Sequence, residues 1–334
     1  MTPIVSIIIP VYNAAPYLYA CLDSVRMQSC KNIEVIVIND CSTDNSRYLI
    51  EQYIKEYNDV SIKLLDFPVN QGQSAARNCG LKNAIGKYVY LLDSDDDIVV
   101  NCINDLVYIA ESDNLSLVLG ENYIVSNGEK KIVRVDVEKD RLYGKEILDT
   151  FTQRKWYNQP WNKLVRRDII ENNDLYFAEG HILEDELWSF QLATRINSMG
   201  ILKEPTYNYY VRQGSTLNSV LKEKKRWDEF LCINALLRTY IIDNNLSEND
   251  GVSRYFLTNL LVNIDGFRIC GSLSYNIFKN IIDVNYVDVY QLYVRGYLSK
   301  KECFAYLYFN LPKVIGYRFY SFLCILWRLK KKRK

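Results

Sequence analysis

The segment KYVYLLDSDDD, residues 87–97, is an apolar run that ends abruptly in carboxylates. Its acidic side chains are Asp93, Asp95, Asp96 and Asp97. Negative charges this close repel one another unless a cation or a solvated turn absorbs the charge. Closely spaced carboxylates bind hard divalent cations such as Mg²⁺ or Mn²⁺, which usually complete their shells with phosphate oxygens. The run therefore predicts either a metal and phosphate site or a solvated acidic loop.

Polar residues end two other apolar runs. The first run, VSIIIPV at 5–11, passes through Pro10 into Tyr12, and the second, EVIVIND at 34–40, ends in Asp40. A carboxylate such as Asp40 can accept hydrogen bonds from a base or a ribose, or it can form a turn. Arg77, in AARN, can counter phosphate charge or form an ordinary ion pair.

These runs belong to an alternation of strands and helices over the first 125 residues. β-Branched apolar runs predict strands, and apolar residues at helical spacing predict the segments between them. We expect Ser42 or Thr43 to cap the second helix and Gly86 to end the third. The strands are expected at 5–11, 34–40, 60–67, 87–93 and 115–125, and the helices at 15–28, 42–57, 73–86 and 101–112.

This rhythm predicts an α/β fold with a mostly parallel sheet and right-handed crossovers. Ligands of such sheets bind outside the carboxyl ends of the strands. The clusters near Tyr12, Asp40 and Asp93 should therefore meet at one edge of the sheet. Neither a Walker loop nor a G-x-G-x-x-G fingerprint is present, so a nucleotide bound there would use another mode.

Beyond residue 125 the pattern loosens. Asn127-Gly128 predicts the turn of a hairpin, and helices are expected at 143–151 and 184–196. Residues 206–216 predict a strand running into a polar loop, and the chain from about Lys222 onward is helical in pattern.

Charge and cysteine content exclude several classes. The net charge is +1, but residues 328–334 hold six basic side chains, which leaves 35 basic against 40 acidic groups in the rest. No broad basic face suggests nucleic acid as a partner. The nine cysteines form no C-x-x-C pair and no secretory signal precedes them, which favours reduced thiols in the cytoplasm. The longest apolar run, 319–327, is too short to span a bilayer.

Four segments together resemble the family 2 glycosyltransferases. They are VSIIIPVYN, VIVINDCSTDNS, NQGQSAARNCGL and YVYLLDSDDD. The resemblance is dense over residues 4–105 and thinner to about residue 216, and it is closest to the bacterial polysaccharide-biosynthesis type. It implies a GT-A-type, Rossmann-like, mostly parallel sheet flanked by helices. We expect this catalytic domain to occupy residues 1–220 and a C-terminal helical region to occupy 221–334.

The resemblance also implies a nucleotide-sugar donor, usually a UDP-sugar. By their match to the family motifs, Pro10, Tyr12 and Asp40 would contact the nucleoside, and Arg77 would lie near the base or diphosphate. Asp93 and Asp95 match the D-x-D motif, with Asp95 as the direct ligand of Mg²⁺ or Mn²⁺ and Asp93 nearer the ribose. Asp96 occupies the position of the adjacent carboxylate that some members use. Cys41 stands where the family more commonly has glycine, so that turn must form without glycine's freedom.

EDELW, at 184–188, resembles the family's acidic catalytic segment. Asp185 is the implied general base, with Glu184 as the second candidate. An inverting transfer needs a carboxylate that takes the proton of the acceptor hydroxyl while that oxygen attacks the anomeric carbon. Acidic residues also collect in the first turn of helices because the macrodipole favours them, so the spacing alone leaves a purely structural role open.

The resemblance implies further residues of the sugar pocket. Trp161, Asn162 and Lys163, in PWNKLVRR, would wall the acceptor or donor sugar site, although a buried tryptophan can equally be core. Arg212 lies in the loop 212–216, which could close over the diphosphate or simply be surface. His181, the only histidine, can be a metal ligand or an ordinary side chain.

The C-terminal region mixes aromatic and aliphatic residues with a basic end. This composition suits a helix lying on an anionic membrane surface, or a final core helix with a solvated end. The first option predicts a cytoplasmic enzyme that is peripheral on the inner face of the cell membrane.

The leading hypothesis is an inverting, metal-dependent glycosyltransferase that extends a saccharide or lipid-linked acceptor in cell-surface polysaccharide biosynthesis. The alternative is a non-catalytic nucleotide-sugar-binding subunit of a membrane-associated assembly. The presence of both the acidic run and the 184–186 triplet favours catalysis, because a binding module has no use for a base. A nucleotidyltransferase would want a glycine-rich basic loop after the first strand, and PVYNAAPY lacks one.

Overall fold

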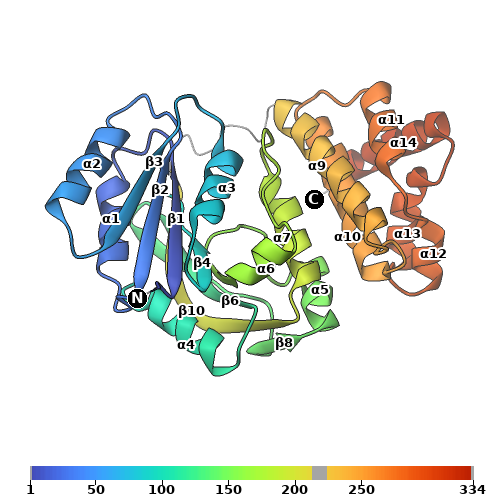
Figure 1. Ribbon diagram of the computed structural model, residues 1–334. Coiled ribbons are helices and arrows are strands. Elements are labelled where there is room, and N and C mark those ends of the chain that lie inside the picture. Colours follow the sequence, from blue (N-terminus) through green and yellow to red (C-terminus); the bar gives the residue numbers. More distant parts are fainter. Residues whose placement is uncertain (1, 213–223, 332–334) are drawn as a thin grey trace. The chain divides into compact units, whose positions relative to one another are not determined.

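The computed structural model describes residues 2–212 and 224–331. They divide into two compact units, with the boundary between Gln213 and Gly214. The first unit is an α/β domain and the second is helical (Figure 1). The predicted sheet and the predicted C-terminal helices are thus both present.

The α/β unit is built on one ten-stranded sheet, in which eight strands follow the order β3-β2-β1-β4-β9-β6-β10-β5. Neighbouring pairs of β1 with β2, β2 with β3, β1 with β4 and β6 with β10 are parallel. The strands are β1 (Val5–Val11), β2 (Ile33–Asn39), β3 (Ser61–Asp66), β4 (Tyr88–Leu91), β5 (Asp97–Ile98), β6 (Leu117–Ser126), β7 (Glu129–Val133), β8 (Arg141–Tyr143), β9 (Lys163–Arg166) and β10 (Ser198–Tyr210).

Three strands, β5, β8 and β9, were not predicted. Strand β9 runs antiparallel to both of its neighbours, β4 and β6, in the middle of the sheet. It consists of four residues, KLVR, which is too short for a periodic signal. Two short outer strands, β5 and β8, are also antiparallel to β10, so the sheet is mostly parallel with antiparallel insertions.

Helices cover both faces of the sheet. In Figure 1, α1 and α2 lie on one side of strands β1 to β3 and α3 lies on the other. This arrangement follows from right-handed crossovers that run in opposite directions along the sheet. The connections from β1 to β2 and from β2 to β3 run one way, and the connection from β3 to β4 runs back across β2 and β1. The helices of this unit are α1 (Leu18–Arg26), α2 (Ser46–Glu56), α3 (Gln73–Asn83), α4 (Cys102–Ser112), α5 (Lys145–Thr152), α6 (Arg167–Asn172) and α7 (Glu184–Arg195).

The core explains why these segments pack. The β1 residues Ile7 and Ile9 are fully buried in one cluster with Leu18 of α1 and Tyr53 of α2. The intervening Ile8 points to the opposite face, where a β-carbon added at Gly80 of α3 would lie 2.3 Å from its Cγ2. The absence of a side chain at Gly80 lets α3 approach the sheet, and α3 carries Arg77.

Two predicted caps are wrong and one predicted turn is confirmed. Helix α2 begins after Asn45, and the Ser42 hydroxyl instead accepts a hydrogen bond from the Asn13 amide in the neighbouring loop. Gly86 does not cap α3. It packs against β1, where an added β-carbon would lie 2.6 Å from the Ser6 nitrogen. The β6–β7 hairpin turns at Asn127-Gly128 as predicted, with both residues at positive φ.

The second unit contains helices only, within the described residues 224–331. They are α9 (Lys224–Asp243), α10 (Asp250–Ile269), α11 (Tyr275–Val284), α12 (Val289–Val294), α13 (Lys300–Tyr306), the short 3₁₀ helix η1 (Leu307–Phe309) and α14 (Lys313–Lys331). Trp227 of α9 packs on Gly266 of α10 so closely that a β-carbon there would lie 2.1 Å from the indole ring. Phe278 and Tyr320 join α11 to α14 through ring contacts.

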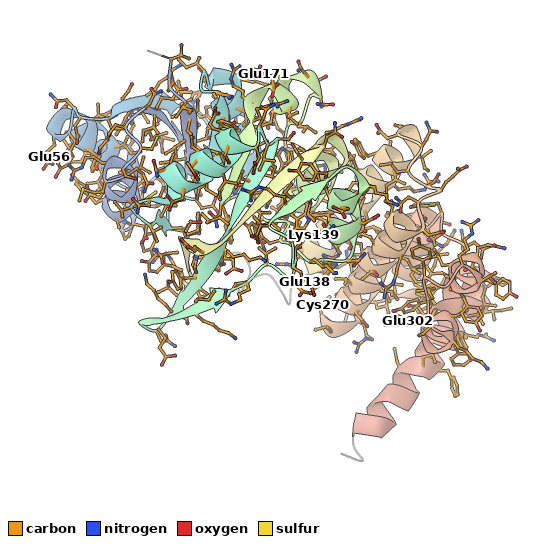
Figure 2. The ribbon with its side chains drawn as sticks, turned by 90° about the horizontal axis from the view of Figure 1, so that it is seen from below. Glu56, Glu138, Lys139, Glu171, Cys270 and Glu302 are labelled. Carbon is orange, nitrogen blue, oxygen red and sulfur yellow. The ribbon has the colours of Figure 1, made fainter. Side chains whose placement is uncertain are left out.

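The last helices carry local signals that define their starts. Helix α13 begins with a capping box. The Ser299 hydroxyl accepts a hydrogen bond from the Glu302 backbone amide, and the Glu302 carboxylate accepts one from the Ser299 backbone amide. Figure 2 labels Glu302 and shows the end of α14 extending away from the other helices of this unit. None of the helices within 2–212 and 224–331 is long and apolar enough to cross a bilayer.

Candidate active site

The carboxyl ends of β1 and β2 meet as predicted. Val11 pairs with Asn39 at the ends of the two strands. Asn13, in the loop after β1, accepts hydrogen bonds through its side-chain oxygen from the amides of Thr43 and Asp44, in the loop after β2. The two loops therefore form one connected edge.

Asp40 is buried at this edge and is already engaged. Its carboxylate accepts hydrogen bonds from the Asn70 side chain at 2.9 Å, the Gln71 amide at 2.7 Å and the Gly72 amide at 2.8 Å. It thereby fixes the loop that leads into α3. Contact between Asp40 and a nucleoside stays a prediction.

The two residues at the end of β1 that were predicted to contact the nucleoside differ in exposure. Pro10 is buried within the strand, and Tyr12, the first residue after it, is exposed. Cys41 adopts a φ of 54°, in the region that glycine enters without strain. The expected turn without glycine therefore forms, at a cost on the order of 1–3 kcal/mol.

Strand β10 sorts the acidic run after β4 into two sets. The Asp96 carboxylate accepts hydrogen bonds from the Tyr207 hydroxyl at 2.8 Å and from the Tyr210 amide at 2.9 Å. The Tyr210 hydroxyl donates to Asp97 at 2.7 Å. Asp96 and Asp97 thus connect the loop to β10. The Asp96 side chain is buried and does not face solvent as Asp93 and Asp95 partly do.

Asp93 and Asp95 are partly exposed, and no residue of β10 is found to bind their carboxylates within the described chain. Their side chains are 21% and 43% exposed. Burial, and then the charge of Asp93, raises the pKa of Asp95 above its ordinary value. Burial, then Asp93 and Asp95, raises the pKa of Asp96 to about 8. A cation bound at this loop would relieve the repulsion that these shifts express.

The donor set fits a hard divalent cation that shares its shell with a ligand. Among the described residues, no group of three or more His, Cys, Asp and Glu side chains is placed to hold a metal ion. Asp93 and Asp95 stay the predicted protein ligands, and two carboxylates would leave room for other oxygens around the ion. Mg²⁺ and Mn²⁺ sites of this kind take their other oxygens from phosphate and water.

Arg212 lies beside Asp95. Its Nε is 3.5 Å from Asp95 Oδ2, its guanidinium also donates to the Asp95 backbone oxygen, and its Cζ lies 3.6 Å from the centre of the Tyr17 ring. The guanidinium lies at the acidic loop that contains Asp95, and its contact with a diphosphate stays a prediction. The rest of the predicted closing loop, including Ser215 and Thr216, lies outside the described residues.

Arg77 joins the acidic run to the 184–186 triplet. Its guanidinium is 3% exposed and forms ion pairs with Asp93 at 2.9 Å and Glu184 at 2.7 Å. The sequence placed Arg77 near the base or diphosphate of a donor. In the structure both ends of the guanidinium bind protein carboxylates, and direct contact with a donor stays a prediction.

The three acids that begin α7 have different partners. Glu184 pairs with Arg77, and Glu186 accepts hydrogen bonds from the Asn158 side chain at 2.6 Å and the Arg154 guanidinium at 3.3 Å. The only hydrogen bond found for the Asp185 carboxylate within the described chain comes from the Glu186 amide. Asp185 thus differs from the other two acids in having no ion pair within the described chain, and its role as the base stays a prediction.

The surroundings of Asp185 suit a general base. Burial, then the charges of Glu184 and Glu186, raises the pKa of Asp185 to about 7, against the opposing charge of Arg77. A base works best when its pKa lies near the working pH. The preceding Leu183 has a φ of 66°, an unusual conformation for a branched residue and one that often occurs at functional sites.

Trp161 and Lys163 lie one layer beneath this surface. Trp161 is 7% exposed and stacks on Tyr207 with ring centres 4.5 Å apart. Lys163 is 1% exposed, donates to the Gln159 backbone oxygen and lies 4.1 Å from the centre of the Tyr157 ring. Burial lowers the pKa of Lys163 well below its ordinary value. Trp161 and Lys163 therefore pack beneath the loop residues in this structure, and direct contact of either with a sugar stays a prediction.

Tyr207 is a site residue that the sequence did not reveal. Its hydroxyl donates to Asp96, accepts from the Asp93 amide at 3.3 Å, and its ring stacks on Trp161. The available signal was the alternation of tyrosines in TYNYY, residues 206–210, which places Tyr207 and Tyr209 on one face of the strand.

A Rossmann-like sheet with a D-x-D loop and an acidic helix start at its carboxyl edge defines a glycosyltransferase of the GT-A fold, an enzyme that uses a nucleotide-sugar donor. The chain belongs to glycosyl transferase family 2, because the family model of that description matches residues 6–173. It is also 31% identical over 238 residues to the uncharacterized glycosyltransferase EpsJ of Bacillus subtilis, covering 69% of this chain and 67% of that protein.

Solved structures share the fold over both units. Residues 1–349 of Staphylococcus aureus TarS, in complex with UDP-GlcNAc, align with a TM-score of 0.73 and 22% identity over 95% of this chain and 90% of that one. The mannosyltransferase PcManGT of Pyrobaculum calidifontis, in complex with GDP-Man and Mn²⁺, aligns with a TM-score of 0.56 and 14% identity, covering 89% and 80%. At these identities the likeness establishes the fold.

Proposed function

We propose that this glycosyltransferase is inverting and metal-dependent, and that it transfers a sugar from a UDP-sugar to a saccharide or lipid-linked acceptor in cell-surface polysaccharide biosynthesis. The observation that carries the proposal is Asp185. It is the one acid of its triplet without an ion-pair partner among the described residues, and its pKa is raised to about 7. This carboxylate favours an enzyme over the non-catalytic binding subunit.

The chain's own residues supply two parts of the reaction. Asp185 would accept the proton of the attacking acceptor hydroxyl, while Arg77 and Glu184 hold the start of α7 in place. Asp93 and Asp95 would hold Mg²⁺ or Mn²⁺ together with the donor's diphosphate. When bound, the cation stabilises the negative charge that builds on the departing diphosphate. The complexes of TarS with UDP-GlcNAc and of PcManGT with GDP-Man and Mn²⁺ support this class of donor and cation.

A donor screen tests the proposal directly. Purified protein is incubated with a panel of UDP-, GDP-, CDP- and dTDP-sugars, with Mn²⁺ or with chelator, and release of the nucleoside diphosphate is measured. We expect turnover with at least one UDP-sugar and only with the metal. Turnover confined to another nucleotide would refute the UDP assignment. Release that continues in chelator would refute metal dependence, and a product that keeps the donor's anomeric configuration would refute inversion.

We also propose that the enzyme is peripheral on the inner face of the cell membrane, docked through α14. The exposed side of this helix carries Val314, Ile315 and Phe322, together with the exposed Arg318. The opposite side, with Tyr320 and Leu323, is buried in the helical unit. An apolar stripe with adjacent basic residues matches an anionic lipid surface, which combines an apolar interface with negative charge.

Vesicle sedimentation tests the docking. The full chain should bind vesicles containing phosphatidylglycerol more strongly than vesicles of phosphatidylcholine alone, because the basic groups add electrostatic attraction. Ile315→Glu should reduce binding to the anionic vesicles several-fold, because it places a charge in the apolar stripe. Val262→Glu is the matched control, since Val262 is exposed on α10 of the same unit. Equal loss in both variants, or no preference for anionic vesicles, would contradict this docking surface.

A further inference from the structure

Arg77 is placed unlike an ordinary surface or phosphate-binding arginine. One arm of its guanidinium binds Asp93, 16 residues away in the acidic loop, and the other binds Glu184, 107 residues away at the start of α7. The two carboxylates are themselves only 21% and 8% exposed. The orientation of a buried guanidinium with two carboxylate partners is fixed, because turning away from either partner would leave a buried charge without compensation.

The next residue of α3 makes a second connection to the same region. Asn78 donates from its side-chain nitrogen to the Phe177 backbone oxygen and the Glu179 carboxylate, both at 2.9 Å, and accepts from the Phe177 amide at 2.8 Å. Arg77 and Asn78 together therefore attach α3 to both ends of the segment 177–184. This segment contains Leu183 in its left-handed conformation and leads directly into Asp185.

The charges around Asp185 give Arg77 a second effect. The groups that act on Asp185 are Glu184 and Glu186 on its own helix and Arg77 on α3, and Lys163 on β9 feels the charge of Asp185 in turn. Glu186 is balanced by Arg154 and Asn158. Arg77 is the cation that favours the ionised form of Asp185, and Glu184 opposes it.

We propose that Arg77 is a positioning residue that couples the two acidic sites, because its single guanidinium holds Asp93 of the donor loop and Glu184 beside the base. It acts through these carboxylates and does not touch the donor. The proposal deepens the function proposed above and rests on it for the role of Asp185. It differs from the expectation that Arg77 contacts the base or diphosphate, and the two give different results.

The kinetic test uses three variants and two readouts. Arg77→Gln removes the charge, Arg77→Lys keeps it but cannot hold both carboxylates in a fixed fork, and Glu184→Gln removes the opposing charge with little change in shape. Turnover of a UDP-sugar is measured against pH at saturating donor, and UDP affinity is measured by calorimetry with Mn²⁺.

We expect Arg77→Gln to lower turnover about 100-fold, the loss typical of a misplaced catalytic group, and to move the acid limb of the pH profile upward. Glu184→Gln should move that limb downward, and Arg77→Lys should lower turnover without moving it. UDP affinity should change less than about fivefold in all three. If Arg77→Gln weakens UDP binding 100-fold or more, or leaves the acid limb in place, Arg77 is a donor ligand or a bystander and the proposal is overturned.

A stability measurement keeps the test independent of turnover. The pH dependence of unfolding is compared between chains with and without Asp185→Asn, because that difference reports the ionisation of Asp185 through linkage. The pKa of Asp185 inferred in this way should be higher in the Arg77→Gln background than in the wild-type background, and lower in the Glu184→Gln background. If Arg77→Gln does not fold, the Glu184→Gln shift alone decides, and its absence overturns the proposal. If the wild-type chain turns over no donor but the two variants show both pKa shifts, the proposed function is refuted and the coupling by Arg77 still stands.

Discussion

Replacing Asp185 with asparagine should lower the turnover of sugar transfer about 10²- to 10⁴-fold, the range that general acid–base catalysis contributes. The amide keeps the shape of the side chain but cannot accept the proton of the acceptor hydroxyl. UDP affinity should remain near the wild-type value, because the donor loop is formed by other residues. Asp113→Asn is the control, since Asp113 is an exposed carboxylate paired with Arg141 at the surface.

The same residue predicts the pH dependence of the wild-type enzyme. The base acts as the carboxylate, and its pKa is raised to about 7. Activity should therefore fall as the pH drops through about 7 and level off above it, and Asp185→Asn should lose this limb. Full activity in Asp185→Asn, or a wild-type rate that stays level down to about pH 5, would exclude Asp185 as the base.

Replacing Asp95 with alanine should weaken Mn²⁺-dependent binding of UDP roughly 100-fold or more, since even residues that only support metal ligands contribute 10- to 100-fold. Calorimetric titration with Mn²⁺ and with chelator measures this. Wild-type protein in chelator should behave like the variant, and the variant should respond little to Mn²⁺. The physical reason is that the Asp95 side chain is more exposed than that of Asp93, and its pKa is raised by burial and by Asp93.

Asp105→Ala provides the comparison for that experiment. Asp105 is a carboxylate in the first turn of the nearby helix α4, outside the acidic loop. Its loss should leave UDP binding within about twofold of wild type, because it has no proposed ligand role. If Asp95→Ala retains metal-dependent binding while chelator abolishes it, the cation is held elsewhere.

The part of the fold that was predictable is the part encoded by local pattern. The run VSIIIPV predicted β1 with its observed bounds because a short, continuous run rich in β-branched residues is typical of a buried strand. The hairpin at Asn127-Gly128 was predictable because both turn residues tolerate positive φ. Strand β9 was not, because its four residues become a strand only through the edges of β4 and β6.

The site divides in the same way. The sequence identified the carboxylates of the acidic loop and of α7, but it could not show which of them face a ligand. That choice is made by Tyr207 and Tyr210, 111 and 114 residues away from Asp96. The raised pKa of Asp185 likewise depends on burial and on neighbours brought together by the fold. Lys163 was predicted at the pocket wall. The structure shows that it is buried against Tyr157, which the sequence did not reveal, and its contact with a sugar stays a prediction.

The late position of β9 in the chain has a consequence during synthesis on the ribosome. Strands β1 to β4 and their helices can fold from local crossovers as soon as residue 91 has emerged, but the free edge of β4 is paired only by β9, whose last residue is Arg166. At roughly 5–20 residues per second, the intervening ~75 residues take about 4–15 s to make. During that interval a nascent chain exposes an open sheet edge, the feature through which unrelated strands associate. Truncated chains that end between β4 and β9 should therefore aggregate. A shortened catalytic unit should keep β9 and end after it.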